Sequence, residues 1–414
     1  MNSFESALDW LYGTQQFGIK PGLELMHRLA DALALHTQPA PARKPLLVQS
    51  SPAYIHVAGT NGKGSTCTFI AAICREAGLR TGLYTSPHLI CFRERIQING
   101  LQIPEDEVLD GLRAIREIIK NWRPHPTFFE ITTALALNWF NEKRAEVVVL
   151  ETGMGGRLDA TNIVNPCVSV ITRIAFDHEQ SLGDTLDKIA FEKAGIIKRS
   201  TPVVSASQDP IVEHVLNTRA SELDTTVSWT TSPYDGPLGI KGTVQRWNAA
   251  LAINAIQASG LSISDTAIRE GLSSAKWPGR FQLISENLIL DGAHNPNAAH
   301  VLTENWRATF GDEKACLVFG CMTDKDIEGV LSNLKPIAAS IQLSPVQSPR
   351  AAQVSDLQNL CHRVMPGIPV KSHHSLQAAL AVETQHRRLV TGSLFLVGEA
   401  LGIIQGTFRE ASLQ

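Results

Sequence analysis

The sequence has few of the features that mark secreted, zinc-binding or membrane proteins. It contains 7 cysteines in 414 residues, and none of them form a Cys-x-x-Cys pair. An odd number of cysteines in apolar surroundings argues against a disulfide framework and predicts reduced thiols in the cytoplasm. No uncharged apolar run approaches ~18 residues, and the N-terminus lacks a basic start followed by an apolar stretch. We therefore expect neither a membrane span nor a signal peptide.

An excess of charge of either sign is also missing. The formal net charge is -3 at pH 7, and 19% of the residues are charged. This balance gives no indication of a nucleic-acid or membrane surface. The chain has no internal repeat or low-complexity tract, and its 43% of hydrophobic residues is typical of a globular protein. The length predicts two domains.

The stretch with the most chemical content is residues 54–66, Tyr-Ile-His-Val-Ala-Gly-Thr-Asn-Gly-Lys-Gly-Ser-Thr. Its apolar start predicts a buried strand, and three glycines then free the backbone before a helix that begins near Ser65. In such a loop, backbone N–H groups bind phosphate oxygens, Lys63 reaches the β- and γ-phosphates, and Ser65 or Thr66 offers a hydroxyl to a metal. The spacing departs from the strict Gly-x4-Gly-Lys-Ser/Thr pattern, so an ordinary strand-to-helix turn is the alternative.

Hydrophobic strands alternate with helical segments along the rest of the chain. This alternation predicts an α/β protein with a mostly parallel sheet flanked by helices. The segments fall into two domains, because residues 277–280 look like a junction. We expect a phosphate-loop (P-loop) ATPase domain in 1–282 and a smaller Rossmann-like α/β domain in 283–414.

The expected elements can be given by residue range. Two helices should lie in 4–36, and others at 105–122, 129–141 and 185–197. Strands are expected at 83–85, 146–151, 168–174, 288–291, 315–320, 339–343 and 394–397, with a loop and edge hairpin in 89–104. Residues 200–245 look polar and strand-like, and Asn248 is expected to open an Ala-rich helix.

Polar residues follow several of the predicted strands. Thr85-Ser-Pro-His88 follows one strand, Glu151 and a glycine-rich loop follow another, and Asp177-His178 follows a third. The carboxyl ends of parallel strands meet at one edge of a sheet, where ligands bind. An acid at that edge is where phosphate-loop enzymes place a Mg²⁺ ligand, although an isolated one is as often a helix cap or a loop salt bridge. Composition alone would place Lys193 on a helix surface.

These motifs occur in the order found in one enzyme family. The sequence reads GTNGKGS at 59–65, TSPH at 85–88, ETGMGGRLDATN at 151–162, DH at 177–178, EKAG at 192–195, PGR at 278–280 and DGAHNP at 291–296. Over nearly its whole length the chain resembles folylpolyglutamate synthases and dihydrofolate synthases, which belong to the Mur ligase superfamily.

The resemblance implies ATP-dependent amide formation. A carboxylate attacks the γ-phosphate of ATP to give an acyl phosphate, and the amine of L-glutamate then displaces phosphate. Leu158-Asp159-Ala160 after the paired glycines resembles the bacterial bifunctional type, which adds glutamate both to dihydropteroate and to reduced folates. Two Mg²⁺ ions and Lys63 would offset the charge on the transferring group. The resemblance also favours a monomer.

The resemblance implies a role for individual residues, which we give by function. The triphosphate would be held by Gly59, Thr60, Asn61, Gly62, Lys63, Gly64, Ser65 and Thr66, and the rest of the nucleotide by Asn248, Arg280 and Asp291. Ser86 and Glu151 resemble ligands of the first Mg²⁺, and His178 a ligand of the second. Lys193 matches a lysine that becomes a carbamate, and His294, together with Asp291, would help to position glutamate. The pteridine and benzoate groups would lie near 18–21, Phe129, Leu158, Asp159 and Ala160, with core packing as the alternative for Phe129.

Three other functions are compatible with parts of this pattern. A synthase that only extends folates is the nearest. A phosphate-loop NTPase switch would explain Lys63 and Glu151, but not Arg280 or the residues around His294. A cell-wall amino-acid ligase usually carries a further N-terminal domain, and only about 50 residues precede the glycine loop here.

Overall fold

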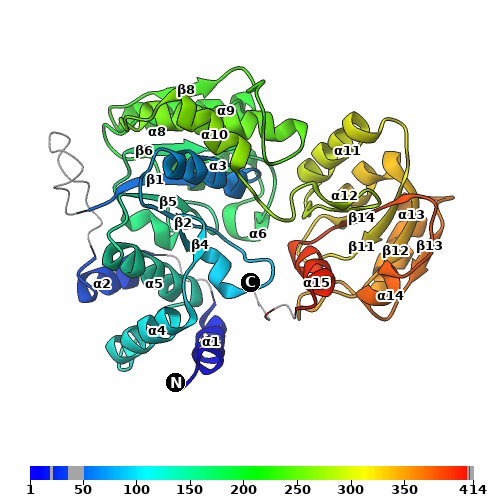
Figure 1. Ribbon diagram of the computed structural model, residues 1–414, viewed down its shortest axis with the longest axis horizontal. Helices are drawn as coiled ribbons and strands as arrows, with labels where there is room; N and C mark the ends of the chain where they lie inside the picture. Colours follow the sequence, from blue (N-terminus) through cyan, green and yellow to red (C-terminus); the bar gives the residue numbers. More distant parts are fainter. Residues whose placement is uncertain (19–21, 36–50, 408–409, 411–414) are drawn as a thin grey trace.

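The strand that leads into the glycine loop lies at the centre of the larger of two sheets (Figure 1). The structure is a computed structural model that describes residues 1–18, 22–35, 51–407 and 410. In its larger sheet the strand order is β4-β3-β2-β5-β1-β6-β7-β8, and β1 pairs in parallel with both β5 and β6. The strands are β1 Ala53–Ala58, β2 Thr81–Tyr84, β3 Ile96–Ile98, β4 Leu101–Gln102, β5 Val147–Glu151, β6 Val168–Ile171, β7 Val203–Ala206 and β8 Val227–Thr230.

The predicted edge hairpin is confirmed. β3 and β4 are antiparallel and end the sheet on one side. Asn99 and Gly100, which connect them, both have positive φ, of 51° and 78°. Two positive φ angles in a two-residue loop are the geometry that Asn-Gly favours.

Helices cover both faces of this sheet. Tyr54 of β1 enters a core formed with α1, α4 and α5, whereas its neighbour Ile55 enters one formed with α3, α9 and α10. The alternation follows from the period of two in a strand, and it explains why β1 is apolar at successive positions. The helices of this domain are α1 Phe4–Gly13, η1 Thr14–Phe17, α2 Glu24–Ala32, α3 Lys63–Glu76, η3 Phe92–Arg95, α4 Glu105–Ile119, α5 Phe128–Glu142, η4 Ala160–Ile163, α6 Glu179–Leu182, α7 Leu186–Ala194, α8 Pro210–Glu222, α9 Thr243–Ala258 and α10 Asp265–Ser274.

The second domain is a smaller α/β unit, as predicted. Its sheet has the order β13-β12-β11-β14-β10-β9, and within it only β9 is antiparallel to its neighbour. The elements are β9 Gln282–Ser285, β10 Leu288–Leu290, α11 Pro296–Phe310, β11 Ala315–Phe319, α12 Ile327–Leu334, η5 Lys335–Ile337, β12 Ala338–Leu343, α13 Val354–Val364, β13 Val370–Ser372, α14 Leu376–Leu380, β14 Arg387–Thr391 and α15 Leu394–Gln405.

One predicted strand is wrong. Residues 394–397 begin helix α15, and the strand of this region is β14, which ends at Thr391. The Ser393 hydroxyl accepts a hydrogen bond from the Phe395 N–H and caps the helix. A short apolar run fits a buried helix as well as a buried strand, and the cap decides between them.

The interpretation of residues 200–245 as strand-like is also incomplete. Helix α8 lies between β7 and β8, and its start carries a cap at Asp209 followed by Pro210. Helix α9 begins at Thr243, so Asn248 lies in its second turn and does not open it.

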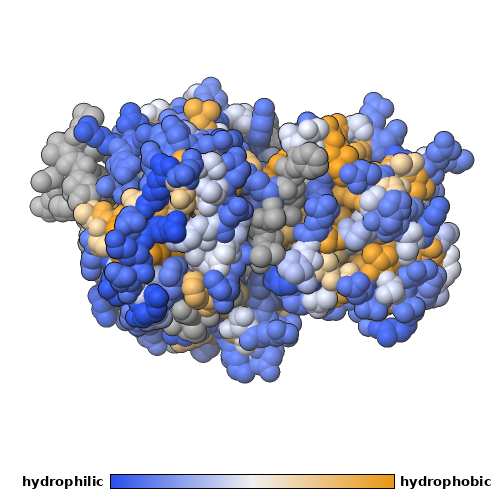
Figure 2. All heavy atoms as spheres, turned by 90° about the horizontal axis from the view of Figure 1, so that it is seen from below, coloured by the Kyte–Doolittle hydropathy of each residue, from blue (hydrophilic) through white to orange (hydrophobic). Residues whose placement is uncertain are grey.

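The hydropathy of the surface is that expected of a globular protein. The face in Figure 2 is mostly hydrophilic, with apolar groups more frequent on the half formed by the C-terminal domain. Across the described ranges, no helix is both long and apolar enough to cross a membrane.

Candidate active site

A large cavity of about 1520 Å³ lies between the two domains, at the carboxyl ends of the central strands. Its lining includes every residue for which the sequence predicts a site role except Thr66. Thr66 is fully buried in α3, and its hydroxyl has no hydrogen-bond partner within the part of the chain that the structure describes. Ser65, which lines the cavity, is therefore the better candidate for the hydroxyl near a metal. The predicted 18–21 segment reaches the lining at Gly18, and residues 19–21 lie outside the described residues.

The glycine loop has the backbone geometry of an anion cradle. Gly59 and Gly62 have φ of 145° and 92°, which only glycine adopts without strain. A Cβ at Gly62 would lie 2.5 Å from Oδ1 of Asn248, so the loop packs closely against α9. Helix α3 begins at Lys63, and its first N–H groups have no partner within the helix. These groups and the helix dipole face the cavity.

Two N–H groups of the loop are already used within the protein. The N–H groups of Thr60 and Asn61 both donate to the carbonyl oxygen of Arg173, at 2.9 and 3.1 Å. The Thr60 hydroxyl donates in turn to the carbonyl oxygen of Ala175. The first part of the loop is thus fastened to the segment after β6, and the cradle is formed from Gly62 onward.

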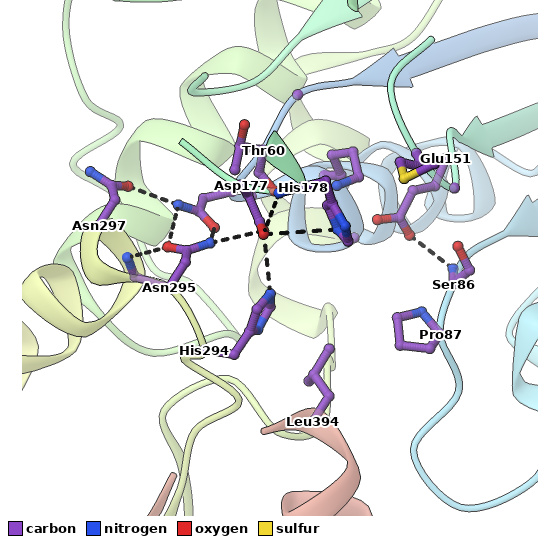
Figure 3. A pocket seen from close by; sticks show the side chains of 18 of the residues that line it. Thr60, Ser86, Pro87, Glu151, Asp177, His178, His294, Asn295, Asn297 and Leu394 are labelled. Atoms are coloured by element: carbon purple, nitrogen blue, oxygen red, sulfur yellow. Dashed lines mark hydrogen bonds and ion pairs between the residues drawn. The ribbon is translucent and has the colours of Figure 1, made fainter. Parts of the chain in front are cut away.

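Two predicted residues, Ser86 and Glu151, lie together at the ends of β2 and β5, and the charge of Lys63 at the start of α3 acts on Glu151. Glu151 is 4% exposed, and its Oε2 accepts a hydrogen bond from the Ser86 N–H at 3.1 Å (Figure 3). Burial raises the pKa of the Glu151 carboxyl, and the positive charge of Lys63 partly opposes that rise. The Lys63 ammonium donates to the carbonyl oxygen of Thr60 at 3.2 Å. A bound metal cation would favour the charged form of the buried Glu151 carboxylate, as Lys63 does.

Lys193 is buried rather than on a helix surface. It is 4% exposed, and its Nζ donates to the carbonyl oxygen of Gly59 at 2.9 Å. Burial, and then the charge of Lys63, lower its pKa to about 7. The paired glycines explain the close fit of α7: a Cβ at Gly156 would lie 2.9 Å from the carbonyl oxygen of Lys193 itself. The glycine-rich loop after β5 therefore helps to fix this lysine.

Asp159 organises the same glycine-rich loop. Its Oδ2 accepts hydrogen bonds from the N–H groups of Gly153 and Met154, at 2.9 and 3.0 Å, and its Oδ1 accepts from Thr161. Thr161 in turn meets Nε2 of the fully buried His56 at 2.8 Å. Burial lowers the pKa of His56 to about 3, so its ring is neutral. Both oxygens of Asp159 therefore already accept hydrogen bonds from the loop. A role for Asp159 in binding substrate stays a prediction.

Phe129 lies between the cavity and the core. Its ring lines the cavity and packs 6.0 Å from the ring of Tyr84. A Cβ at Gly153 would lie 2.4 Å from its Cζ. Both predicted roles, stacking surface and core packing, thus have support. Leu158 and Ala160 line the same side of the cavity.

The C-terminal domain contributes residues from the segment after β10. Asp291 accepts hydrogen bonds from the N–H groups of Phe281 and Ala293, at 2.8 and 2.9 Å. Burial raises the pKa of Asp291, and the charge of Arg280 partly opposes that rise. Nδ1 of His294 lies 2.8 Å from the carbonyl oxygen of Gly292, and its Nε2 lies 3.6 Å from Asp177 (Figure 3).

Asn295 and Lys325 are the main site residues that the sequence did not predict, and both contact Asp177 where the two domains meet. Asp177 accepts a hydrogen bond from Lys325 Nζ at 2.7 Å and another from Asn295 Nδ2 at 3.2 Å. Burial alone would raise the pKa of Asp177, but the hydrogen bond and charge of His294, followed by the charges of His178 and Lys325, hold it well below its usual range. The Asp177-His178 motif was visible in the sequence, but its partners across the interface were not.

The predicted metal ligands fit a magnesium site only in part. Ser86 and Glu151 supply oxygen, which Mg²⁺ prefers, and His178 supplies an imidazole. Throughout the described segments, no three His, Cys, Asp or Glu side chains gather into a metal-binding group. An ion here would need oxygens from phosphates or water, which is how Mg²⁺ is usually held in nucleotide sites.

Comparisons with known proteins agree with this geometry. Residues 57–235 match the Mur ligase middle domain, and residues 279–397 match the Mur ligase glutamate ligase domain. A dihydrofolate synthase/folylpolyglutamate synthase of Bacillus subtilis is 34% identical over an alignment of 445 residues, covering 96% of this chain and 98% of that protein. One of Escherichia coli is 37% identical, covering 81% and 83%.

Solved structures give the same result over the whole chain. Escherichia coli FolC in complex with DHPP and ADP superposes with a TM-score of 0.86, at 32% identity and 98% coverage of both chains. A bifunctional folylpolyglutamate synthase/dihydrofolate synthase of Yersinia pestis, complexed with AMPPNP and Mn ion, gives 0.83 at 31% identity and 98% coverage of both. The chain therefore belongs to the Mur ligase family, in the group of dihydrofolate synthases/folylpolyglutamate synthases.

Proposed function

We propose that this protein is an ATP-dependent ligase that adds L-glutamate to dihydropteroate and to reduced folates. One observation carries the proposal: the phosphate loop, Glu151 and Lys193 of one domain line the same cavity as Asp291 and His294 of the other. A nucleotide switch has no need for the second set. The FolC structure that matches 98% of this chain was determined with DHPP and ADP, which is the ligand pair such a cavity would take.

The nucleotide would lie along the glycine loop. Lys63 and the first N–H groups of α3 would bind the β- and γ-phosphates, and Asn248, against Gly62, would contact the adenine. Arg280 and Asp291 would reach the nucleotide from the domain junction. These positive charges are in place before the reaction. They would therefore stabilise the charge that develops on the transferring phosphoryl group, and the protein would not have to reorganise its dipoles during the step.

We propose that Ser86 and Glu151 hold one Mg²⁺ and that His178 contacts a second. When bound, such ions neutralise charge on the phosphate oxygens as the acceptor carboxylate attacks. A related structure contains AMPPNP and Mn ion, which supports a divalent metal. The number of ions and the ligand set can be tested by metal titration of the Glu151 variant described in the Discussion.

We propose further that Lys193 is carbamylated in the active enzyme. A carbamate forms from a neutral amine and CO₂, and a pKa of about 7 leaves much of the amine neutral near that pH. The modification would turn a buried cation into an anion close to Lys63. Mass spectrometry of protein prepared with bicarbonate should find a gain equal to one CO₂ that is absent in a Lys193→Met variant.

The acceptor acid would bind beside Phe129, Leu158 and Ala160, on the N-terminal side of the cavity. Glutamate would enter from the C-terminal side, where His294 lies. The acyl phosphate would then form at the centre of the cavity, and closure of the domains would keep water from it. Activity on both acceptors is supported by the relatives of Bacillus subtilis and Escherichia coli, which are named for both reactions.

The test is phosphate release from Mg-ATP with L-glutamate present, with dihydropteroate in one reaction and a tetrahydrofolate in another. Turnover in both reactions is expected. Turnover with the folate alone would identify an extending enzyme. Release that is independent of glutamate would support a nucleotide switch instead.

Three broader features complete the proposal. We place the protein in the cytoplasm, because all seven cysteines are free thiols and five of them are buried. We propose domain limits at 1–282 and 283–414, close to the start of β9 at Gln282. We also propose a monomer, which light scattering at the assay concentration would test.

A further inference from the structure

A small network of amide side chains joins the phosphate loop to the C-terminal domain. Nδ2 of Asn61 donates to Oδ1 of Asn297 at 2.8 Å and to Oδ1 of Asn295 at 3.3 Å. Asn295 donates back, from its own Nδ2 to Oδ1 of Asn61 at 3.1 Å. The same Nδ2 group also donates to Asp177 at 3.2 Å, and Figure 3 shows Asn295 directed at Asp177 beside His294. One residue of the C-terminal domain thus contacts two separate loops of the N-terminal domain.

Asn295 is held firmly by its own domain. It is 2% exposed and is the N-cap of α11, where its Oδ1 accepts a hydrogen bond from the Ala298 N–H at 2.8 Å. The cap fixes the side-chain rotamer, because the oxygen must face the first turn of the helix. The amide nitrogen is thereby directed outward, toward Asn61 and Asp177.

The two partners in the N-terminal domain are fixed as well. The Asn61 N–H donates to the carbonyl oxygen of Arg173, and the segment that leads to Asp177 is bonded to the same loop, because the Thr60 hydroxyl donates to the Ala175 carbonyl oxygen at 3.0 Å and accepts from the Ala175 N–H at 3.1 Å. Neither loop can move far to follow a displaced α11. Since hydrogen bonds weaken steeply with distance and angle, the network forms only at one relative placement of the two domains.

We propose that Asn295 is a positioning residue that couples domain closure to the phosphate loop. When the two domains are closed, the two hydrogen bonds that Asn295 donates hold the phosphate loop and the Asp177 segment against the start of α11. The amine and the acyl phosphate, which are bound by different domains, are thereby brought into reach. This inference rests on the proposed function, and it assigns to Asn295 a role beyond capping a helix.

The capping role can be kept while the coupling is removed. Serine is as good an N-cap as asparagine but has no amide to reach across the interface. Asn295→Ser should therefore keep the melting temperature of the wild-type protein and lower kcat at least about tenfold, since it removes the donated hydrogen bonds to Asn61 and to the Asp177 carboxylate. The dissociation constant for AMPPNP should change by less than about threefold, because the glycine loop and α3 supply most phosphate contacts.

A control variant isolates the loss of a cap. Ser375 caps α14 in the same domain, accepting from the Ala378 N–H at 3.2 Å, and does not line the cavity. Ser375→Ala should lower the melting temperature slightly and leave kcat unchanged. An equal loss of kcat in both variants would mean that general destabilisation of the domain, and not the network, lowers the rate.

The coupling itself is measured with Asn61→Ala and the double variant. Both substitutions remove the hydrogen bonds between Asn61 and Asn295, and each removes one further bond, to Asn297 or to Asp177. The loss of kcat in the double variant should therefore be smaller than the product of the two single losses. Losses that multiply would overturn the proposal, as would a wild-type kcat in Asn295→Ser.

A second readout does not depend on catalysis. Hydrogen exchange of the backbone in residues 59–67 should become faster in Asn295→Ser, although the substitution lies in the other domain. Unchanged exchange would refute the coupling. If the wild-type protein shows no glutamate-dependent turnover, the proposed function fails, and the exchange experiment still decides whether Asn295 holds the phosphate loop.

Discussion

Replacing Lys193 by methionine should change how the stability of the ligand-free protein depends on pH. In the folded protein the buried amine has a pKa of about 7, against an ordinary value of 10.5. Between these two values the unfolded chain binds more protons at this site than the folded protein does. The free energy of unfolding therefore rises with pH across that window, and below it the full cost of the buried charge is present.

The magnitude follows from the two pKa values. The whole difference corresponds to about 5 kcal/mol, because each pKa step is worth about 1.4 kcal/mol. Between about pH 7 and about pH 9 the wild-type protein should gain roughly 2 kcal/mol of stability relative to Lys193→Met. Methionine fills a similar space without a charge, and the lost hydrogen bond to Gly59 is a cost that does not vary with pH.

The assay is urea denaturation of both proteins at the two pH values, in buffers freed of CO₂. Parallel pH profiles would refute the reasoning, because they would mean that the amine is no harder to protonate in the folded protein than in the unfolded chain. Adding bicarbonate gives a second comparison. It should stabilise the wild-type protein and leave the methionine variant unchanged, since a ligand that binds only the folded state stabilises it.

The remaining predictions concern the phosphate loop and the metal. Lys63→Ala should lower kcat/KM for ATP turnover by about 10²–10⁴-fold without a change in melting temperature, and near-normal kinetics would remove Lys63 from the site. Glu151→Gln keeps the shape of the side chain but removes its charge, so the Mg²⁺ concentration at half-maximal rate should rise at least about tenfold; an unchanged metal titration would contradict the assignment. Gly62→Ala should cost about 1–3 kcal/mol of stability, because its φ is +92° and its Cβ would meet Asn248. Thermal melting with and without AMPPNP measures that cost and should also show weaker stabilisation by the nucleotide.

The sequence was sufficient for the elements whose signal is local. Asn99-Gly100 gives the edge hairpin, and the run that ends at Glu151 gives a central strand. Local signals failed where two structures share one pattern. The apolar residues after Ser393 fit a strand or a buried helix equally well, and the cap that selects the helix is a single hydroxyl.

The site shows the same division. The motif around Lys63 is a contiguous stretch whose chemistry is visible in its residues, whereas the burial of Lys193 depends on a helix packing against glycines far away in the sequence. The contacts of Asp177 with Asn295 and Lys325 are harder still, because they span 118 and 148 positions and join two domains. The sequence on either side of Asp177 does not indicate that Asn295 and Lys325 are its partners.

In the proposed arrangement the acceptor acid and the amino acid bind to opposite domains, and this has a consequence for how such proteins can diversify. The proposed acceptor side of the cavity is lined by Phe129 and the loop that ends at Asp159, and the proposed amine side by His294. Selection for a different amino acid can therefore act on the C-terminal domain while the acceptor pocket stays intact. The reverse also holds, provided that Asn61 and Asn295 still meet. Exchange of whole C-terminal domains between related ligases is then a practical route to new amides, with the interface asparagines as the residues to preserve.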